Sequence, residues 1–362
     1  MKKVDLNTSL MKTGNLENKY NSFVLKTMLI TVSLIIVFIA IIVIIDPFYH
    51  YHAPIEPLKL IAEKESYQNI GMAKHLEYDS FITGSSMTEN FKVSQFNELY
   101  ECNTIKLPFE GGRAENYRIL FETVFNNKEI KNVFWGLDVH GFIDPVDSMP
   151  NRIPEYIYDN NLFTDTEYVL NKTVMVKYAL NNLKKSIKGE IKDWDSIYAW
   201  YPYHVFSKTA VMNSYTRPSQ VETKSPDLYK ENVNANMGKI EKYISDNPQT
   251  QFNIFLPPYS IMYYDFWNQC GELEAFCNAY EIVIERLLKY PNVKLSAFYA
   301  EKEIICNLDN YKDYTHYSNE INELIANKMK MGECELTKEN ARQYIDNAKE
   351  FFMNYDYEQL FN

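Results

Sequence analysis

Hydrophobic positions are most concentrated in one run near the N-terminus. Residues 27–45 (TMLITVSLIIVFIAIIVII) form a stretch of 19 residues without a charged side chain. At about 1.5 Å per residue, a helix of this length crosses the hydrocarbon core of a bilayer. The polar lead before the run is long, and no small-x-small motif follows Ile45, so we interpret it as an uncleaved transmembrane helix rather than a signal peptide. No second apolar run of this length occurs, which predicts a single-span protein.

The charges around this run predict its orientation. Five lysines precede it, whereas none follows closely after Asp46. Because positive charge is retained on the cytoplasmic side, we expect residues 1–26 in the cytoplasm and everything after Asp46 outside the cell. Phe48, Tyr49 and Tyr51 are then predicted to form an aromatic belt at the membrane interface.

From residue 79 onward the pattern changes to short apolar runs that alternate with helix-patterned segments. Each run has four to six residues and is rich in Val, Ile, Phe or Leu. This alternation is typical of an α/β domain in which a parallel sheet is covered by helices on both faces. The predicted strands are 80–83, 104–107, 132–137, 251–256 and 293–298.

Three further segments flank or interrupt this domain, which we place at 79–330. Residues 46–78 hold three prolines and then a mixed helical stretch, and we interpret them as a linker with an N-terminal helix. Residues 144–250 break the alternation. Their polar and aromatic tract, 194–226, is interpreted as part of an insertion that covers or lengthens a cleft, with a plain surface excursion as the alternative. Residues 331–362 are predicted to form a C-terminal helical tail.

The residues with chemical potential follow the predicted strands. In parallel sheets, ligands bind beyond the carboxyl ends of the strands. One rim of the sheet is therefore expected to collect a nucleophile, flexible backbone amides, a carboxylate and a histidine. In chain order, these strand-end residues are Gly84-Ser85-Ser86, Gly111-Gly112-Arg113, Asp138, Tyr259, and finally Asp313 with His316.

A serine together with a late Asp-x-x-His motif outlines an acyl-transfer site. A serine hydroxyl is barely ionised at neutral pH and needs a base to attack a carbonyl. Asp313 and His316 lie at i and i+3, which brings both side chains to one face of a turn. Asp313 can then fix the tautomer of His316 while the other ring nitrogen faces Ser86. The inert alternative is that Ser85 or Ser86 only caps a helix.

The other strand-end residues are candidates for holding the substrate. Gly111 and Gly112 can bring backbone amides close to a substrate oxygen and, with the Ser86 amide, hold an oxyanion. A tight turn is the alternative for the two glycines, and a structural cap is the alternative for Asp138. The candidates for substrate binding are Asp138, Arg113 and Tyr259.

Composition narrows the functional classes. The net charge is −11 and no basic stripe occurs, which argues against nucleic-acid binding. The five cysteines include no C-x-x-C motif and predict neither a disulfide framework nor a zinc site, so no cofactor or metal is expected. A bridge between Cys270 and Cys277 stays open. The 29 tyrosines fit a sugar groove or an interface as well as an ordinary core.

In these motifs the chain resembles the SGNH/GDSL hydrolase superfamily, and in particular its membrane-anchored bacterial branch of DltD-like proteins and polysaccharide O-acetyltransferases. Gly84-Ser85-Ser86 is similar to the Gly-Ser-Ser variant of the nucleophile block, and Asp313 with His316 is similar to the last block. The superfamily has an Asn donor in the third block, where this chain has Asp138. The resemblance implies a three-layer, flavodoxin-like sheet, with Ser86 as nucleophile, His316 as base and Asp313 as its orienting partner.

The resemblance also implies a function and a partner. It implies a serine O-acyltransferase on the outer face of a bacterial cell membrane that O-acetylates a cell-surface or secreted polysaccharide through an acyl-serine intermediate. Such proteins work with a multi-pass membrane-bound O-acyltransferase, which supplies the acyl group. Two alternatives stay open. One is a carbohydrate esterase with the same triad, and the other is a non-catalytic scaffold subunit of a polysaccharide export or modification complex.

Overall fold

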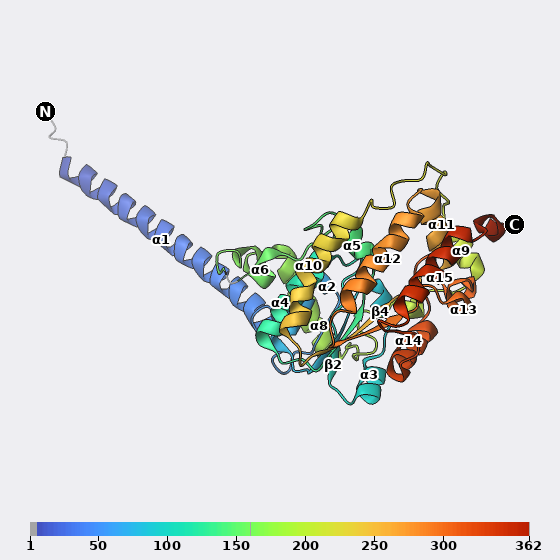
Figure 1. Cartoon of the computed structure of the whole chain (residues 1–362). Coiled ribbons are helices and arrows are strands. Elements are labelled where there is room, and N and C mark those ends of the chain that lie inside the picture. Colours follow the sequence, from blue (N-terminus) through green and yellow to red (C-terminus); the bar gives the residue numbers. More distant parts are fainter. Residues whose placement is uncertain (1–5, 160, 362) are drawn as a thin grey trace.

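The protein consists of one long N-terminal helix and a mixed α/β domain (Figure 1). The structure is a computed structural model that describes residues 6–159 and 161–361. All five predicted strands are confirmed, with ends within one residue of those expected. A sixth, two-residue strand was not predicted. The strands are β1 (Ser80–Thr83), β2 (Thr104–Lys106), β3 (Asn132–Gly136), β4 (Gln251–Leu256), β5 (Val293–Ala297) and β6 (Glu335–Leu336).

The six strands form one sheet in the order β2-β1-β3-β4-β5-β6. The first five are parallel, and β6 pairs antiparallel with β5. The order 2-1-3-4-5 is common among doubly wound α/β sheets, which bind ligands where the chain switches direction across the sheet. Here that switch lies between β1 and β3. The segments that follow these two strands therefore begin at the favoured place for a site.

Helices cover the sheet and connect its strands. Five of them contact one another in sequence across the domain: α2 (Glu65–His75), α4 (Ala114–Asn127), α10 (Lys230–Asp246), α12 (Leu273–Leu287) and α15 (Ala341–Asn354). Two others pack on each other, α3 (Val93–Tyr100) and α14 (Asn319–Met331). The remaining helices are α5 (His140–Ile143), α6 (Glu155–Tyr158), α7 (Thr166–Val169), a π-helix (Val174–Ala179), α8 (Leu180–Lys188), α9 (Lys208–Ser214), α11 (Ile261–Gln269) and α13 (Lys302–Ile305).

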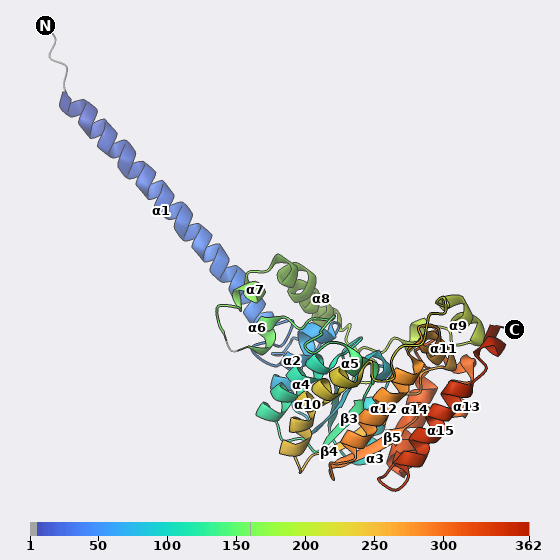
Figure 2. The same cartoon turned by 45° about the horizontal axis from the view of Figure 1, so that its top comes forward.

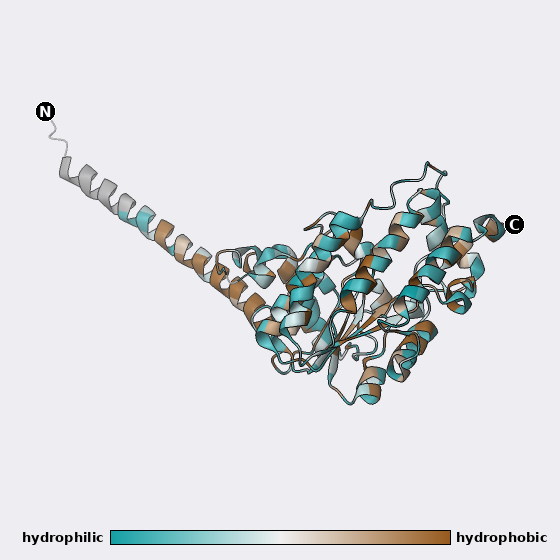
Figure 3. Cartoon of the chain, viewed as in Figure 1, coloured by the Kyte–Doolittle hydropathy of each residue, from teal (hydrophilic) through white to brown (hydrophobic). Residues whose placement is uncertain are grey.

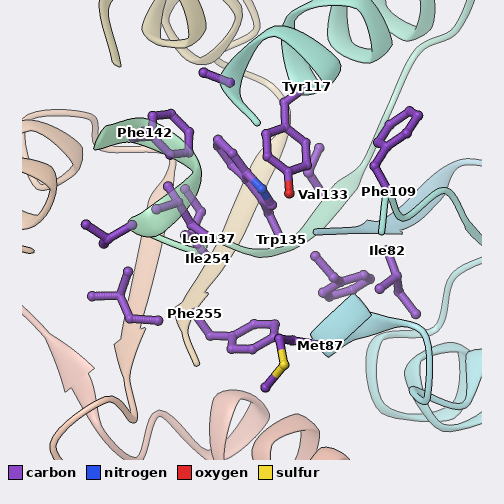
Figure 4. Packing of buried hydrophobic residues seen from close by; sticks show 14 of the residues in the cluster. Ile82, Met87, Phe109, Tyr117, Val133, Trp135, Leu137, Phe142, Ile254 and Phe255 are labelled. Atoms are coloured by element: carbon purple, nitrogen blue, oxygen red, sulfur yellow. The ribbon is translucent and has the colours of Figure 1, made fainter. Parts of the chain in front are cut away.

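The core beneath the carboxyl ends of the strands is largely aromatic (Figure 4). Trp135 of β3 packs on Tyr117 and Phe121 of α4, with ring centroids 5.3 and 5.1 Å apart. Phe255 of β4 and Met87, which follows Ser86, are buried in the same cluster. Burial of Met87 stabilises the short turn that presents Ser86, because returning an apolar side chain to water costs free energy.

The N-terminal helix, α1 (Leu6–Ile45), extends away from the domain. From Asn18 to Ile45 it is long and apolar enough to cross a bilayer, and most of this apolar surface is exposed (Figure 3). The predicted run at 27–45 lies within this segment. Only the last turns of α1 contact the domain, where Ile42 and Ile45 are buried.

The predicted aromatic belt is wrong for Phe48 and Tyr49. The Phe48 ring is fully buried against Tyr168 and Tyr178, with centroids 5.4 and 4.8 Å away. The Tyr49 hydroxyl donates to the Ile61 carbonyl at 2.9 Å and accepts from the Ile61 amide at 2.7 Å. Both side chains therefore face the protein core rather than lipid.

A buried carboxylate turns the chain back into the domain directly after α1. Asp46 accepts hydrogen bonds from the amides of His50, Tyr51 and His52 at 3.0, 2.7 and 2.9 Å, and from the Tyr168 hydroxyl at 2.7 Å. The start of the expected linker at 46–78 is thus a packed turn. The Asp46 carboxylate thus ties the end of α1 to residues 50–52 and to Tyr168 of the domain.

The C-terminal segment is helical, as predicted, and it is part of the domain. Strand β6 extends the sheet beside β5, and α15 contacts α12. The buried ring of Phe352 stacks on Tyr264 with centroids 3.8 Å apart. All five cysteines are free thiols, so Cys270 and Cys277 are not bridged in this structure.

Candidate active site

The turn after β1 is shaped by a glycine that no other residue could replace without strain. Gly84 has φ +147°, and a Cβ there would lie 2.5 Å from the Cγ2 atom of Thr88 and 2.7 Å from the Gly136 carbonyl oxygen. Ser85 follows in extended conformation, and its Oγ accepts from the Met87 amide at 3.3 Å. Ser85 is therefore the serine that caps the short helix Ser86–Thr88, and the hydroxyl of Ser86 is left for another partner.

That partner is a histidine 230 residues downstream. Ser86 Oγ lies 2.9 Å from His316 Nε2. His316 Nδ1 lies 2.9 Å from Asp313 Oδ2 and 3.0 Å from Asp313 Oδ1. The three residues predicted as a catalytic set are thus joined in one hydrogen-bonded chain. All three side chains are partly accessible to solvent, so a substrate can reach them.

Asp313 is held in its ionised form. Its carboxylate accepts from the amides of Thr315 and His316 at 2.9 and 2.8 Å and pairs with Lys312 Nζ at 2.6 Å. Burial by itself raises the pKa of this carboxyl, but the bonds and charge of His316 and Lys312 outweigh burial and hold the pKa well below its ordinary value. Since a carboxylate only accepts, Nδ1 of His316 carries the hydrogen, and Nε2 presents a lone pair to Ser86.

The two motifs are aligned by bonds between the turn after Ser86 and the start of α14. The Tyr317 hydroxyl and the Asn322 side-chain amide both donate to the Met87 carbonyl, at 3.1 and 3.0 Å. The loop before them is closed by the Lys312 amide, which donates to the His316 carbonyl at 3.0 Å. This clamp sets the distance between the serine and the histidine. Tyr317 and Asn322 carry no motif by which the sequence could have identified them.

The insertion supplies one wall of the site. Trp200 donates from Nε1 to the Ser86 carbonyl at 3.2 Å, and its ring meets the His316 ring edge-on with centroids 5.3 Å apart. Lys312 Nζ lies 4.9 Å from the Trp200 ring centroid. Asn90 fixes this wall by accepting from the Trp200 and Tyr201 amides at 3.1 and 3.2 Å. The tract at 194–226 was expected to cover a cleft, but the sequence did not distinguish Trp200 from its neighbours.

Asp138 and Tyr259 lie behind the nucleophile turn and face each other. Both side chains are buried, and the Tyr259 hydroxyl donates to the Asp138 carboxylate. Burial raises the pKa of Asp138, and the neighbouring Ser85 and Tyr259 lower it only in part. Their predicted role in substrate binding stays a prediction, and in this structure the two buried groups support the turn from inside the protein.

The glycine loop after β2 adjoins the nucleophile turn. The Phe109 amide donates to the Gly84 carbonyl at 2.8 Å. The Gly112 amide donates to the Phe109 carbonyl at 2.8 Å, which removes it from the expected set of oxyanion donors. Gly111 has φ +58°, and within residues 6–159 and 161–361 neither its amide nor that of Ser86 has a hydrogen-bond acceptor. These two amides remain the candidates.

The Arg113 guanidinium also bonds to groups within the protein. Its Nε donates to Asp144 and its Nη1 donates to the Gly111 carbonyl at 2.8 Å. The guanidinium therefore braces the glycine loop. The predicted role of Arg113 in substrate binding stays a prediction, and in this structure its guanidinium holds an ion pair and a carbonyl.

Comparison with known proteins adds no family to this geometry. No family model matches the chain, and no curated protein matches it in sequence. In the part of the chain that the structure describes, no group of three or more His, Cys, Asp or Glu side chains is placed to hold a metal ion.

Proposed function

We propose that this protein is a membrane-anchored serine O-acyltransferase of the SGNH type that O-acetylates a cell-surface or secreted polysaccharide. The observation that carries the proposal is the chain from Ser86 Oγ through His316 to the ionised Asp313. The 2-1-3-4-5 strand order and the position of Ser86 after β1 support the expected three-layer, flavodoxin-like arrangement. The Gly-Ser-Ser and Asp-x-x-His motifs support the same superfamily.

In the proposed first step, Ser86 Oγ attacks the carbonyl carbon of an acyl donor while His316 Nε2 takes the hydroxyl proton. Asp313 stays ionised and stabilises the imidazolium. The amides of Ser86 and Gly111 hold the oxyanion of the tetrahedral intermediate. When the intermediate collapses, the bond to the donor's leaving group breaks, and His316 returns the proton to that group. The product is an acyl-serine ester.

In the second step, a sugar hydroxyl takes the place of water. His316 removes its proton as the oxygen attacks the acyl carbon, and the bond to Ser86 Oγ then breaks. The polymer leaves with the ester, and the serine regains its proton from His316. The number of acyl groups is conserved, so no further reactant is required.

The acyl donor is proposed to come from a multi-pass membrane-bound O-acyltransferase. Among the described residues, α1 is the one helix long and apolar enough to cross a bilayer, and a single helix offers no path for an acyl group across it. The excess of lysines before the helix supports an N-terminus in the cytoplasm of a bacterial cell and a domain on the outer face of the membrane. With this topology, the triad lies on the side of the membrane where the polysaccharide is exposed.

Active-site labelling tests the nucleophile. A fluorophosphonate should label the full chain in detergent or nanodiscs, and Ser86→Ala should lose the label. Ser85→Ala is the matched control, because it removes the neighbouring hydroxyl, which caps the turn, and should keep the label. Undiminished labelling of Ser86→Ala would sink the proposal.

Product analysis separates transfer from hydrolysis. The purified protein is acylated with an activated acetyl ester and then offered water or an oligosaccharide. Release of acetate at the same rate with and without the sugar would favour the esterase alternative. If the protein were a non-catalytic scaffold, neither the fluorophosphonate nor the activated ester should react with it. The 2.9 Å contact between Ser86 Oγ and His316 Nε2 argues against this alternative.

A further inference from the structure

The insertion surrounds the base of α1. Figure 2 shows α7 and α8 beside the end of α1, on the edge of the domain from which this helix leaves. Contacts join α1 to α7 and to the π-helix Val174–Ala179, which continues directly into α8. Any membrane that α1 crosses therefore lies next to these segments.

The side chains that the insertion presents here are unusually apolar for a surface. Among large hydrophobic residues in the described chain, the three most exposed are Phe163, Leu162 and Ile187, at 87%, 80% and 78%. Their exposed fractions are larger than those of the described large hydrophobic side chains of α1. Leu180 is also exposed and precedes Ile187 by seven positions on α8, which is the spacing of one helix face. Val176 is exposed in the preceding π-helix. Apolar patches of this kind mark interaction sites.

The opposite face of the same helix is already used by the protein. Met175, Ala179 and Asn182 are buried against the domain. Lys185 pairs with Glu63, and the Lys59 amide donates to Ser186 Oγ at 3.0 Å. The helix is thus held firmly, and its outward apolar residues are not a core face that awaits packing within this chain.

The charge of this region is opposite to that of the whole protein. Residues 168–189 hold five lysines and no Asp or Glu, whereas the whole chain has a net charge of −11. Lys177, Lys184 and Lys188 are exposed beside the apolar residues, and Lys188 also pairs with Glu190 at 3.3 Å. A helix with one apolar side and a row of lysines is typical of segments that lie in the plane of a membrane with anionic lipids.

We propose that this surface lies in the lipid headgroup region of the bilayer that α1 crosses. We call it the interfacial surface and define it by Leu162, Phe163, Val176, Leu180 and Ile187, with Lys177, Lys184 and Lys188. The apolar side chains enter the boundary with the acyl chains, and the lysines contact anionic headgroups.

A second membrane contact, in addition to α1, fixes the tilt of the domain. Residues 189–200 run from this surface to Trp200 at the triad, so the height of the site above the bilayer is set as well. This membrane contact requires only that α1 crosses the bilayer, and it holds whether or not the protein transfers acyl groups.

Photo-crosslinking to lipid tests the surface in the full chain. p-Benzoylphenylalanine replaces Phe163 or Ile187 in protein reconstituted in nanodiscs of phosphatidylcholine and phosphatidylglycerol. Met331→p-benzoylphenylalanine is the control, because Met331 is equally exposed (72%) and ends α14, away from α1. Intact mass should show roughly tenfold more lipid adduct at positions 163 and 187 than at 331, as expected of side chains in the interface. Equal yields at the three positions would overturn the proposal.

Two further arms complete the test. Lys177→Gln, Lys184→Gln and Lys188→Gln combined should lower the adduct yield at position 187 in discs with phosphatidylglycerol but not in pure phosphatidylcholine. An unchanged yield would refute the role of the lysines. In native membranes, a discrete protein adduct at position 187 without lipid adducts would show a protein-docking surface and overturn the lipid assignment. Thermal unfolding of each variant, compared with the wild type, reports whether it is folded.

Discussion

The indole of Trp200 lies edge-on to the imidazole of His316, with ring centroids 5.3 Å apart, and the same indole donates a hydrogen bond to the Ser86 carbonyl at 3.2 Å. One side chain of the insertion thus touches both reacting partners of the proposed triad. The insertion and the sheet act together in forming the site.

Replacing Trp200 separates its two contacts. Trp200→Phe keeps a ring beside His316 but loses the bond to Ser86, so we expect the rate of Ser86 labelling to fall by about 2- to 10-fold, the range for one neutral hydrogen bond. In Trp200→Ala the labelling rate should fall further, because the ring beside His316 is lost as well. Stopped-flow acylation with an activated ester measures both. Trp194→Phe is the control within the same tract and should leave the rate unchanged.

Replacing Asp313 by Asn should remove most of the activity without removing the nucleophile. The amide can donate to Nδ1 and so favour the tautomer whose Nε2 carries a hydrogen, which cannot accept the proton of Ser86. In triads of this kind such a change lowers kcat about 10⁴-fold. Steady-state ester hydrolysis measures the loss. A decrease of less than tenfold would contradict the assigned role of Asp313.

Stability should depend on pH through the same carboxyl. The pKa of Asp313 is depressed in the folded protein below its ordinary value of 3.8, so the unfolded chain binds the proton first as the pH falls. The stabilisation is therefore complete at neutral pH and is lost as the pH falls from about 5 through the folded pKa. Thermal unfolding of the wild type between pH 7 and acid should show a steeper fall in Tm than Asp313→Asn. If Tm fell with pH in parallel for the two proteins, Asp313 would not be the source of the pH dependence.

Lys312→Gln should produce a milder defect than Asp313→Asn. The lysine pairs with Asp313 at 2.6 Å and lies over Trp200, so its loss raises the pKa of Asp313 toward the ordinary value. The carboxyl still ionises at pH 7, because the bonds from His316 and Thr315 remain. We expect less than a tenfold change in kcat at pH 7. Because the folded pKa of Asp313 then lies closer to its ordinary value, Tm should fall less between pH 7 and acid than it does in the wild type. An equal fall in Tm in the two proteins would show that Lys312 does not tune Asp313.

The junction after α1 should contribute to domain stability. Phe48→Ala removes a fully buried ring and should lower the free energy of unfolding by about 3–5 kcal/mol. Phe23→Ala is the matched control on the exposed part of α1 and should have little effect on the domain. Both are measured by thermal or chemical unfolding of the full chain in detergent. Equal stability of the two variants would mean that Phe48 faces lipid after all.

The sequence by itself determined the strands of the sheet and the apolar helix. Four of the five parallel strands are short runs rich in apolar or β-branched residues that are followed within two residues by Gly, Pro or Asp, a pattern that fits buried parallel strands. Ser86, Asp313 and His316 could be predicted because parallel strands bring their carboxyl ends to one edge. Strand β6 has only two residues, which is too short for any period to be read.

Only the tertiary structure decided which groups face the reacting atoms. The sequence does not distinguish Ser85 from Ser86. In the structure, Ser85 Oγ accepts from the Met87 amide, whereas Ser86 Oγ lies beside His316 Nε2. The Gly112 amide and the Asp138 carboxylate form hydrogen bonds within the protein. Trp200 reaches the site from the insertion. The same holds for Phe48, since hydrophobicity does not distinguish a ring in lipid from a ring in a protein core. These outcomes depend on long-range packing and on the direction of single hydrogen bonds, which a local pattern does not contain.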